Sequence, residues 1–236
     1  MAYQAVFKRY ELKYLLTSEQ KKRVLCAIEP YMQLDRYGRT TIRNVYFDTD
    51  TYRLIRRSIE KPTYKEKLRL RSYAQAEAQS PVFAELKKKY HGVVYKRRVC
   101  LPHDDAVEWL CNGERQHVHD VQISDEIDYF MHYYAPLHPT VFLSYEREAY
   151  YERNGGDFRI TFDDHIQFRQ SDLSLDKPIG GISISAPDQV LMELKCSGGV
   201  PLWMTAILSR EKLYKTSFSK YGTAYIATMK EKKNYA

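Results

Sequence analysis

The sequence predicts an α+β fold in which a mostly antiparallel sheet of roughly seven or more strands is flanked by helices. Charged and apolar residues alternate with period two along most candidate strands, and side chains two apart lie on one face of a strand. Twenty-one tyrosines accompany ten glycines and nine prolines, a composition that suits a pleated sheet. Amphipathic stretches with helix-capping residues are available to cover the sheet.

The chain of 236 residues is long enough to bury a substantial core, and we expect residues 1–236 to form a single domain. Hydrophobic residues make up 44% and charged residues 28% of the chain, which excludes extended disorder. The four cysteines form no CxxC pair, so the sequence indicates neither a zinc site nor a disulfide framework. We expect no signal peptide, because residues 1–16 lack its apolar region and cleavage site, and no run reaches the length of a membrane span. We therefore expect a cytoplasmic protein.

The N-terminal part of the chain predicts a strand, a helix and a second strand. Residues 6–16 alternate as a strand does. Thr17 offers an N-cap, with Gln20 at the reciprocal position of a capping box, for an amphipathic helix that extends to about Tyr31. Residues 40–47 are β-branched and aromatic, which predicts the second strand.

The middle of the chain predicts a basic hairpin between two short helices. Asp50 is expected to cap the first of these helices. Residues 64–74 and 82–100 are basic stretches separated by the polar segment AQAEAQSP, so they predict antiparallel strands, with a break at His91-Gly92 in the second stretch. Residues 103–111 predict the second short helix.

The C-terminal half predicts strands and helices in turn. Ser124 is expected to cap a helix over residues 124–134. Residues 140–152 and 158–168 predict two strands joined at Asn154-Gly155-Gly156, a strong hairpin signal. The remaining expectations are an irregular surface loop over residues 170–188, a strand over residues 189–196, a helix from Pro201 to about Tyr214, and a last helix over residues 219–230.

Nearly every predicted strand carries ionisable groups on a single face. An open sheet with a solvated face would account for them, and so would a sheet closed into a barrel, whose charged face would form a lumen that no apolar core fills. The net charge of +7 indicates an anionic partner, such as nucleic acid, nucleotide, polyphosphate or a membrane surface. The residues on these faces are Glu11 and Lys13; Lys67, Arg69 and Arg71; Glu85 and Lys87; Lys96 and Arg98; Tyr145 and Arg147; Arg159 and Asp163, with the polar Thr161 between them; and Glu193 and Lys195.

A cationic lumen of this kind would match a chain of phosphates. Arginine binds phosphate oxygens in bidentate geometry, and lysine acts as a point charge. Glu193 would supply an oxygen ligand to Mg²⁺ or Mn²⁺, which are hard cations that favour carboxylate and phosphate. Further oxygen ligands would come from Glu11, Glu85 or Asp163. These carboxylates would also temper the repulsion between the cations.

Eight short segments together resemble a known family. They are FKRYELKY, RLRSY, AELKKK, YKRRV, YEREAY, FRITFDD, VLMELK and FSKYG, in this order. The ordered set resembles the catalytic domain of the VTC family of polyphosphate polymerases, which belongs to the triphosphate tunnel metalloenzymes of the CYTH-like superfamily. The resemblance extends from about Phe7 to about Gly222, which is most of the chain. It implies a fold of the triphosphate-tunnel type, an antiparallel β-barrel with the charged faces inside.

The resemblance also implies an activity and a site. The activity is transfer of the terminal phosphoryl group of ATP to a growing polyphosphate chain, with release of ADP and with Mn²⁺ or Mg²⁺ as cofactor. Glu193 would be the metal ligand. The expected catalytic residues are Lys13, Arg69, Arg71 and Glu193. The expected substrate-binding residues are Lys87, Lys96, Arg147, Arg159, Lys195 and Lys220, with Lys220 closing one tunnel mouth.

Two other functions stay open. Hydrolytic members of the superfamily open with an ExExK strand, whereas this chain has Arg9, Glu11 and Lys13, so fewer carboxylates are available for a second metal that activates water. This difference favours a transferase over a triphosphatase that hydrolyses nucleoside triphosphate, inorganic triphosphate or an RNA 5′ end. The third candidate is a non-catalytic module that binds polyphosphate or nucleic acid. Nucleic acid is not expected as a partner, because no RNP-like motif accompanies the tyrosines.

Two further expectations concern partners and metals. Eukaryotic polymerases of the family carry a phosphate-sensing domain and a membrane anchor, which we do not expect in this chain, so an unidentified membrane partner is left open. His117 and His119 lie in a polar loop without further ligands, and we expect exposed histidines there rather than a metal site.

Overall fold

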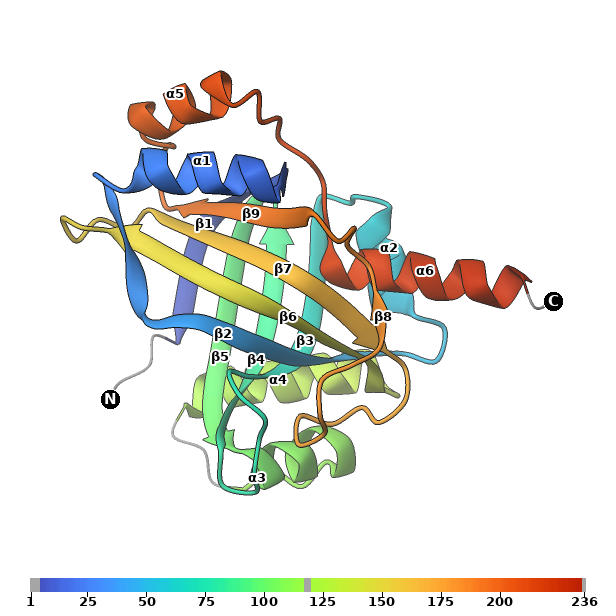
Figure 1. The fold of residues 1–236 in the computed structure, drawn as a ribbon. Coiled ribbons are helices and arrows are strands. Elements are labelled where there is room, and N and C mark those ends of the chain that lie inside the picture. The colour runs from blue at the N-terminus through green and yellow to red at the C-terminus, as the bar shows by residue number, and fades with distance from the viewer. Residues whose placement is uncertain (1–4, 117–119, 235–236) are drawn as a thin grey trace.

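The computed structural model describes residues 5–116 and 120–234. It contains nine strands, six α-helices and one π-helical turn within these residues (Figure 1). In chain order they are β1 (Val6–Thr17), α1 (Ser18–Ile28), β2 (Met32–Asp48), α2 (Arg53–Ile59), β3 (Tyr64–Ser72), β4 (Pro81–Tyr90), β5 (Val93–Pro102), α3 (His103–Val107), the π-helical turn (Glu108–Asn112), α4 (Val121–Tyr133), β6 (His138–Glu152), β7 (Arg159–Arg169), β8 (Ile182–Ser183), β9 (Gln189–Cys196), α5 (Leu202–Arg210) and α6 (Lys220–Asn234).

The strands form an antiparallel barrel. Their order is β6-β2-β3-β4-β5-β1-β9-β7-β8, and an additional pairing between β6 and β7 closes the sheet into a ring. The short strand β8 is attached to β7 outside this ring. The barrel with flanking helices confirms the predicted fold class, and closure decides between the two arrangements left open by the strand pattern. That residues 1–236 form a single domain stays a prediction.

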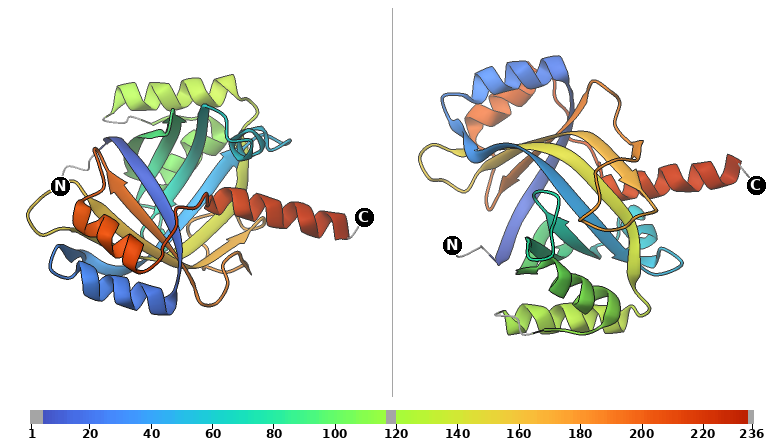
Figure 2. Two further views of the ribbon diagram at one scale, coloured as in Figure 1. Left: turned by 90° about the horizontal axis from the view of Figure 1, so that it is seen from above. Right: turned by 60° about the horizontal axis from the view of Figure 1, so that its bottom comes forward.

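Helices cover the outer, apolar faces of the barrel on two sides (Figures 1 and 2). On one side α1 and α5 pack over β1, β7 and β9 through a cluster that includes Val24, Met192 and Met204. On the other side α3, the π-helical turn and α4 pack over β3, β4 and β5, where Trp109 and Leu68 are fully buried. The apolar faces of the strands are therefore turned outward to the helices, which leaves the charged faces for the interior.

Apolar side chains fill one side of the barrel interior, where β2, β6 and β7 face the first turns of α6. Tyr46 and Tyr221 stack there with ring centroids 4.6 Å apart, and Leu191 is buried in the same cluster. A bulge in β7, with His165 at a φ of 49°, also moves Ile166 into this cluster. The expectation that no apolar core fills the lumen is therefore wrong on this side of the interior.

Two predicted helix caps are not formed, and only one of them is replaced by another side chain. Asp48, not Asp50, accepts hydrogen bonds from the backbone N–H groups of Leu54 (2.9 Å) and Ile55 (3.0 Å) at the start of α2. The chain turns at Tyr52, which has a left-handed backbone and makes no side-chain cap. Helix α4 begins at Val121, so Ser124 lies inside its first turn and donates its hydroxyl to the Asp120 carbonyl. The cap predictions at Asp50 and Ser124 were wrong because tertiary packing placed each helix start differently.

Helix lengths depart from the predictions where the backbone cannot continue. The capping box of Thr17 and Gln20 is present, but α1 ends at Ile28, because Pro30 has no backbone N–H with which to continue the helical hydrogen bonds. Helix α5 ends at Arg210 rather than near Tyr214. The chain leaves it through Lys212, which has a φ of 53°.

Strand β2 starts earlier than predicted and is irregular between Leu34 and Arg39. Gly38 has a φ of 60° there, and the residues before it line the interior cavity. The predictions for His117 and His119 fall outside the described residues. Within the described residues, no helix is long and apolar enough to cross a membrane.

Candidate functional site

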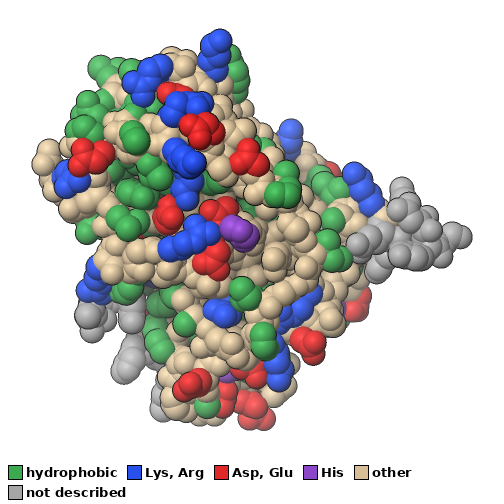
Figure 3. All heavy atoms as spheres, viewed as in Figure 1, with side chains coloured by type: hydrophobic (Ala, Val, Ile, Leu, Met, Phe, Trp, Pro, Cys, Tyr) green, Lys and Arg blue, Asp and Glu red, His purple; other side chains and the backbone are tan. Residues whose placement is uncertain are grey.

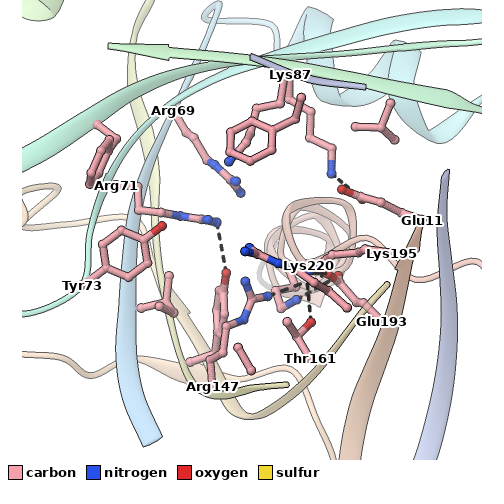
Figure 4. A pocket seen from close by; sticks show the side chains of 18 of the residues that line it. Glu11, Arg69, Arg71, Tyr73, Lys87, Arg147, Thr161, Glu193, Lys195 and Lys220 are labelled. Atoms are coloured by element: carbon pink, nitrogen blue, oxygen red, sulfur yellow. Dashed lines mark hydrogen bonds and ion pairs between the residues drawn. The ribbon is translucent and has the colours of Figure 1, made fainter. Parts of the chain in front are cut away.

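The barrel encloses a cavity of about 940 Å³ that is lined by cations (Figure 4). Sixteen of its lining residues are lysine or arginine, and three are acidic. On the outer face shown in Figure 3, by contrast, acidic and basic side chains are interspersed. Closure of the sheet has gathered the positive charge of most strands around one enclosed space.

All ten predicted site residues line this cavity. Arg69, Arg71 and Arg147 point toward its centre from β3 and β6, and Lys220 points into it from the first residue of α6 (Figure 4). The ten are Lys13, Arg69, Arg71, Lys87, Lys96, Arg147, Arg159, Glu193, Lys195 and Lys220. Their placement is as expected, whereas the part each plays in catalysis or binding stays a prediction.

Glu85 forms ion pairs with the cations of one cavity wall and does not itself line the cavity. Its side chain on β4 is fully buried, and it accepts hydrogen bonds from Arg69 (2.6 Å) and Lys96 (3.0 Å). Arg71 and Arg98 lie 3.8 and 3.9 Å from the same carboxylate. Burial raises the pKa of Glu85, but the surrounding cations outweigh it and hold the pKa well below its ordinary value. Glu85 is thus engaged by four cations and does not line the cavity as a free oxygen ligand.

Asp163 has the same role on the opposite wall. It is fully buried and is bound by Arg147 at 2.6 and 2.7 Å and by Lys220 at 2.6 Å. This contact joins the start of α6 to β6 and β7. Burial lowers the pKa of Lys220, but Asp163 and Glu193 outweigh it, so its pKa is raised and the ammonium group stays charged.

Glu193 is the carboxylate that lines the cavity on β9. Four cations surround it: Lys195 at 3.0 Å, Lys13 at 3.3 Å, Lys220 at 3.4 Å and Arg147 at 3.8 Å. Burial raises the pKa of Glu193, but these cations lower it well below its ordinary value. The group is therefore ionised and available to a cation if its lysine partners turn to an incoming anion.

Two neighbouring groups show how strongly the cavity perturbs ionisation. Burial raises the pKa of Glu11, but Lys87, whose ammonium lies 2.6 Å away, lowers it overall to about 2. Burial lowers the pKa of Lys195 to about 7, although Glu193 opposes this shift. Lys195 also donates a hydrogen bond to Thr161 at 3.0 Å. The wall formed by β1 and β9 is thus densely charged and poorly solvated.

The lysines of β3 and β4 face each other in like-charged pairs. Lys65 lies opposite Lys89, and Lys67 lies opposite Lys87 in the strand register. Like charges directly opposite one another destabilise a sheet. Lys67 is hydrogen-bonded to Ser219 at 3.1 Å, and its pKa is lowered well below its ordinary value by burial and by nearby lysines. Glu11 offsets part of this repulsion through Lys87, and a negatively charged ligand in the cavity would relieve more of it.

The donor set fits a metal that arrives with phosphates rather than one held by protein alone. No group of three or more His, Cys, Asp or Glu side chains suited to a metal is found among the described residues. Glu193 lines the cavity, with Glu11 beside it on the neighbouring strand β1. Mg²⁺ and similar cations are commonly bound through one or two carboxylates while phosphate oxygens and water complete the shell.

Sequence reasoning left several cavity residues without a role. Arg9, Lys65 and Lys89 share a strand face with predicted residues, so strand parity alone could have assigned them. Arg36 and Lys215 lie outside regular alternation, in the irregular part of β2 and in the segment before α6. No pattern in the sequence signals that these segments reach the cavity.

A closed antiparallel barrel around a cationic cavity defines this chain as a protein of the tunnel type. The chain belongs to the VTC domain family, because the family model for the VTC domain matches residues 8–229. No curated protein sequence matches it significantly.

Two solved structures share the fold at low sequence identity. One is a candidate adenylate cyclase from Bacillus halodurans, with 16% identity and a TM-score of 0.59, covering 92% of this chain and 96% of that one. The other is a candidate adenylyl cyclase from Hippeastrum, reported to have a dominant triphosphatase activity. It has 14% identity and a TM-score of 0.51 and covers 90% of this chain and 93% of that one.

Proposed function

We propose that this protein is a metal-dependent polyphosphate polymerase, which transfers the terminal phosphoryl group of ATP to a polyphosphate chain held in the cavity. The observation that carries the proposal is the composition of the cavity lining, with sixteen cations and three carboxylates inside a closed barrel. A linear polyanion matches an elongated cationic cavity better than a compact anion does. Membership of the VTC domain family supports the same conclusion.

The residues of the cavity would act by alignment and charge neutralisation. Arg69 and Arg147 are held by Glu85 and Asp163, so their guanidinium groups are oriented before the substrate binds. An oxygen of the terminal phosphate of the chain attacks the γ-phosphorus of ATP in line, and the bond from that phosphorus to the β–γ bridging oxygen breaks, releasing ADP. The attacking oxygen is already negatively charged, so no side chain needs to serve as nucleophile or base. Cations placed around the transferring group supply most of the catalysis in such reactions.

Glu193 is the residue we propose as metal ligand, with Glu11 beside it. Phosphates entering the cavity would draw Lys13 and Lys195 away from Glu193 and free its carboxylate. A bound Mn²⁺ or Mg²⁺ would neutralise charge on the phosphate oxygens.

A triphosphatase is the second candidate. The activity reported for the Hippeastrum structure supports it at the level of the fold. Against it stands Arg9, which lines the cavity where hydrolytic relatives of this fold would carry a carboxylate. A cation at that position leaves fewer oxygen ligands for a second metal that would activate water.

The deciding experiment is incubation of the purified protein with ATP and Mn²⁺ or Mg²⁺, followed by ³¹P NMR. We expect a growing signal from internal phosphates of a chain together with ADP, and loss of both in Glu193→Ala and Arg69→Ala. Arg97→Ala is the matched control, because Arg97 on β5 pairs with Glu126 of α4 and does not line the cavity. Orthophosphate without chain growth would replace the proposal by the hydrolase, and no turnover would leave a binding module.

A further inference from the structure

The two ends of the cavity differ in chemistry. Along β3 the inward positions are Lys65, Lys67, Arg69 and Arg71, followed by Tyr73 just beyond the strand. Eight residues of extended chain separate the first from the last, or roughly 26 Å. The cavity therefore changes from lysine to arginine and tyrosine along its length.

The lysine end is defined by Lys13, Lys65, Lys67, Lys87, Lys89 and Lys215. These groups are mutual electrostatic neighbours: the pKa of Lys65 is lowered by burial and by Lys89 and Lys13, and that of Lys89 by burial and by Lys87. Lysine acts as a point charge with rotatable donors and imposes no fixed geometry on a phosphate. A surface of this kind holds a uniform chain of phosphates at any register along it.

The arginine–tyrosine end is defined by Arg36, Tyr37, Tyr73 and Arg98, all of which line the cavity. Tyr37 and Tyr73 are 61% and 43% exposed, so their rings are accessible at this mouth. Arg36 lies 4.7 Å from the centroid of the Tyr37 ring, and Arg98 donates to the Tyr73 hydroxyl at 3.4 Å.

Register places these residues at the same end. Ser72, next to Tyr73, pairs with Arg43 of β2, and β2 then runs back toward the irregular segment that carries Arg36 and Tyr37. Aromatic rings and guanidinium planes are the groups that stack on nucleobases and bind them without strong sequence preference.

We propose that the cavity is directional: the nucleoside of the triphosphate donor binds at the arginine–tyrosine end, and the polyphosphate chain occupies the lysine end. The inference rests on the proposed function for the identity of its donor. It assigns to Tyr37 and Tyr73 the recognition of a base, which phosphate binding does not require.

The test compares two ligands that differ by the nucleoside. The β,γ-imido analogue of ATP and inorganic tripolyphosphate are titrated calorimetrically into the wild type and the double variant Tyr37→Ala/Tyr73→Ala. Loss of base stacking in the double variant is expected to raise the Kd of the analogue about tenfold, while the Kd of tripolyphosphate changes less than about twofold. Lys65→Ala/Lys89→Ala is expected to show the converse. Its affinity for long-chain polyphosphate should fall further below the wild-type value than its affinity for the analogue does.

Two controls isolate the ring. Tyr37→Phe/Tyr73→Phe keeps both aromatic faces and should bind the analogue as the wild type does. Tyr129→Ala removes a tyrosine that is 69% exposed on α4, away from the cavity. Equal losses for both ligands in the tyrosine double variant, or no loss for either, would overturn the inference. So would a selective loss of the analogue in the lysine variant.

The NMR assay separates this inference from the proposed function. A wild type that makes polyphosphate but shows no ligand-selective loss refutes the direction alone. If the wild type makes no polyphosphate, but the tyrosine double variant binds the analogue more weakly and tripolyphosphate unchanged, the polymerase is refuted and the nucleoside site is supported.

Discussion

Glu85 carries one negative charge among four positive ones, and this arrangement governs the cavity at the scale of single residues. Its carboxylate on β4 offsets the repulsion among Arg69 and Arg71 of β3 and Lys96 of β5, the two strands that flank β4. Because Glu85 is fully buried, water cannot take its place. Removing the charge leaves the cations facing one another in a medium that screens them poorly.

Glu85→Gln should therefore lower the free energy of unfolding by about 3 kcal/mol, the scale seen when one partner of a buried ion pair is removed. Urea denaturation followed by circular dichroism measures it. The matched control is Glu126→Gln, which removes an acid that pairs with Lys88 and Arg97 on the exterior. A loss for Glu85→Gln no larger than for this control would show that the four cations do not depend on Glu85.

The depressed pKa of Glu85 also predicts how stability responds to acid. A carboxylate whose pKa is lowered on folding contributes stability that is complete above its unfolded pKa of 4.5 and is lost as pH falls through the folded pKa. The gap in unfolding free energy between wild type and Glu85→Gln should be constant above that pH. Below it, the gap should shrink by about 1.4 kcal/mol for each pH unit. A gap that stays constant on further acidification would contradict the assigned pKa shift.

At the scale of elements, Asp48 links a helix start to the barrel interior. It accepts two backbone hydrogen bonds at the start of α2 and a third bond from the hydroxyl of Tyr221 on α6, at 2.9 Å. A residue at the end of β2 thus fixes both helices that flank the apolar side of the barrel. Asp50, which the sequence favoured as the cap, makes no backbone cap contact and has a side chain that is 78% exposed.

Asp48→Ala should lower the free energy of unfolding by about 2 kcal/mol or more, because it removes a helix cap and the charged hydrogen-bond acceptor of the buried Tyr221 hydroxyl. Asp50→Ala should change it by less than about 0.5 kcal/mol, as exposed substitutions do. Chemical denaturation of the pair gives both values. Equal effects of the two substitutions would mean that Asp48 does not anchor α2.

At the scale of the whole molecule, the cations that line the cavity repel one another, and a bound anion would reduce this repulsion. Lys67 is half-buried among like charges, and among the described residues no carboxylate lies within ion-pair distance of it. The net charge of the chain is +7, and much of it faces inward. Stability of the barrel should therefore depend on what the cavity holds.

Inorganic tripolyphosphate at 100 times its Kd should stabilise the protein by about 2.7 kcal/mol, or roughly 5–10 °C in Tm for a chain of this size. Thermal unfolding at low ionic strength, with and without the ligand, measures the shift. Potassium chloride should reduce it by screening. Sodium sulfate at equal ionic strength is the control, and an equal shift with sulfate would show general anion binding rather than a fit to a phosphate chain.

The sequence by itself determined which segments form the barrel strands and which of their side chains share the face that lines the cavity. Side chains two apart must share a strand face, so Arg69 with Arg71, and Glu193 with Lys195, were bound to point the same way wherever the strands went. The ordered short segments predicted the family, and all ten predicted residues do line the cavity. Local periodicity is a backbone property, and it does not depend on what the strand contacts.

Tertiary structure alone decided what each charged group contacts. Glu85 looked like a metal ligand in the sequence, and only the pairing of β3, β4 and β5 makes it the counter-ion of four cations. The bulge at His165 reversed the alternation that would have placed Ile166 on the outer face. Arg36 reaches the cavity through an irregular segment that has no period. Ion pairs, bulges and loop positions depend on strands far apart in the chain, so no local pattern encodes them.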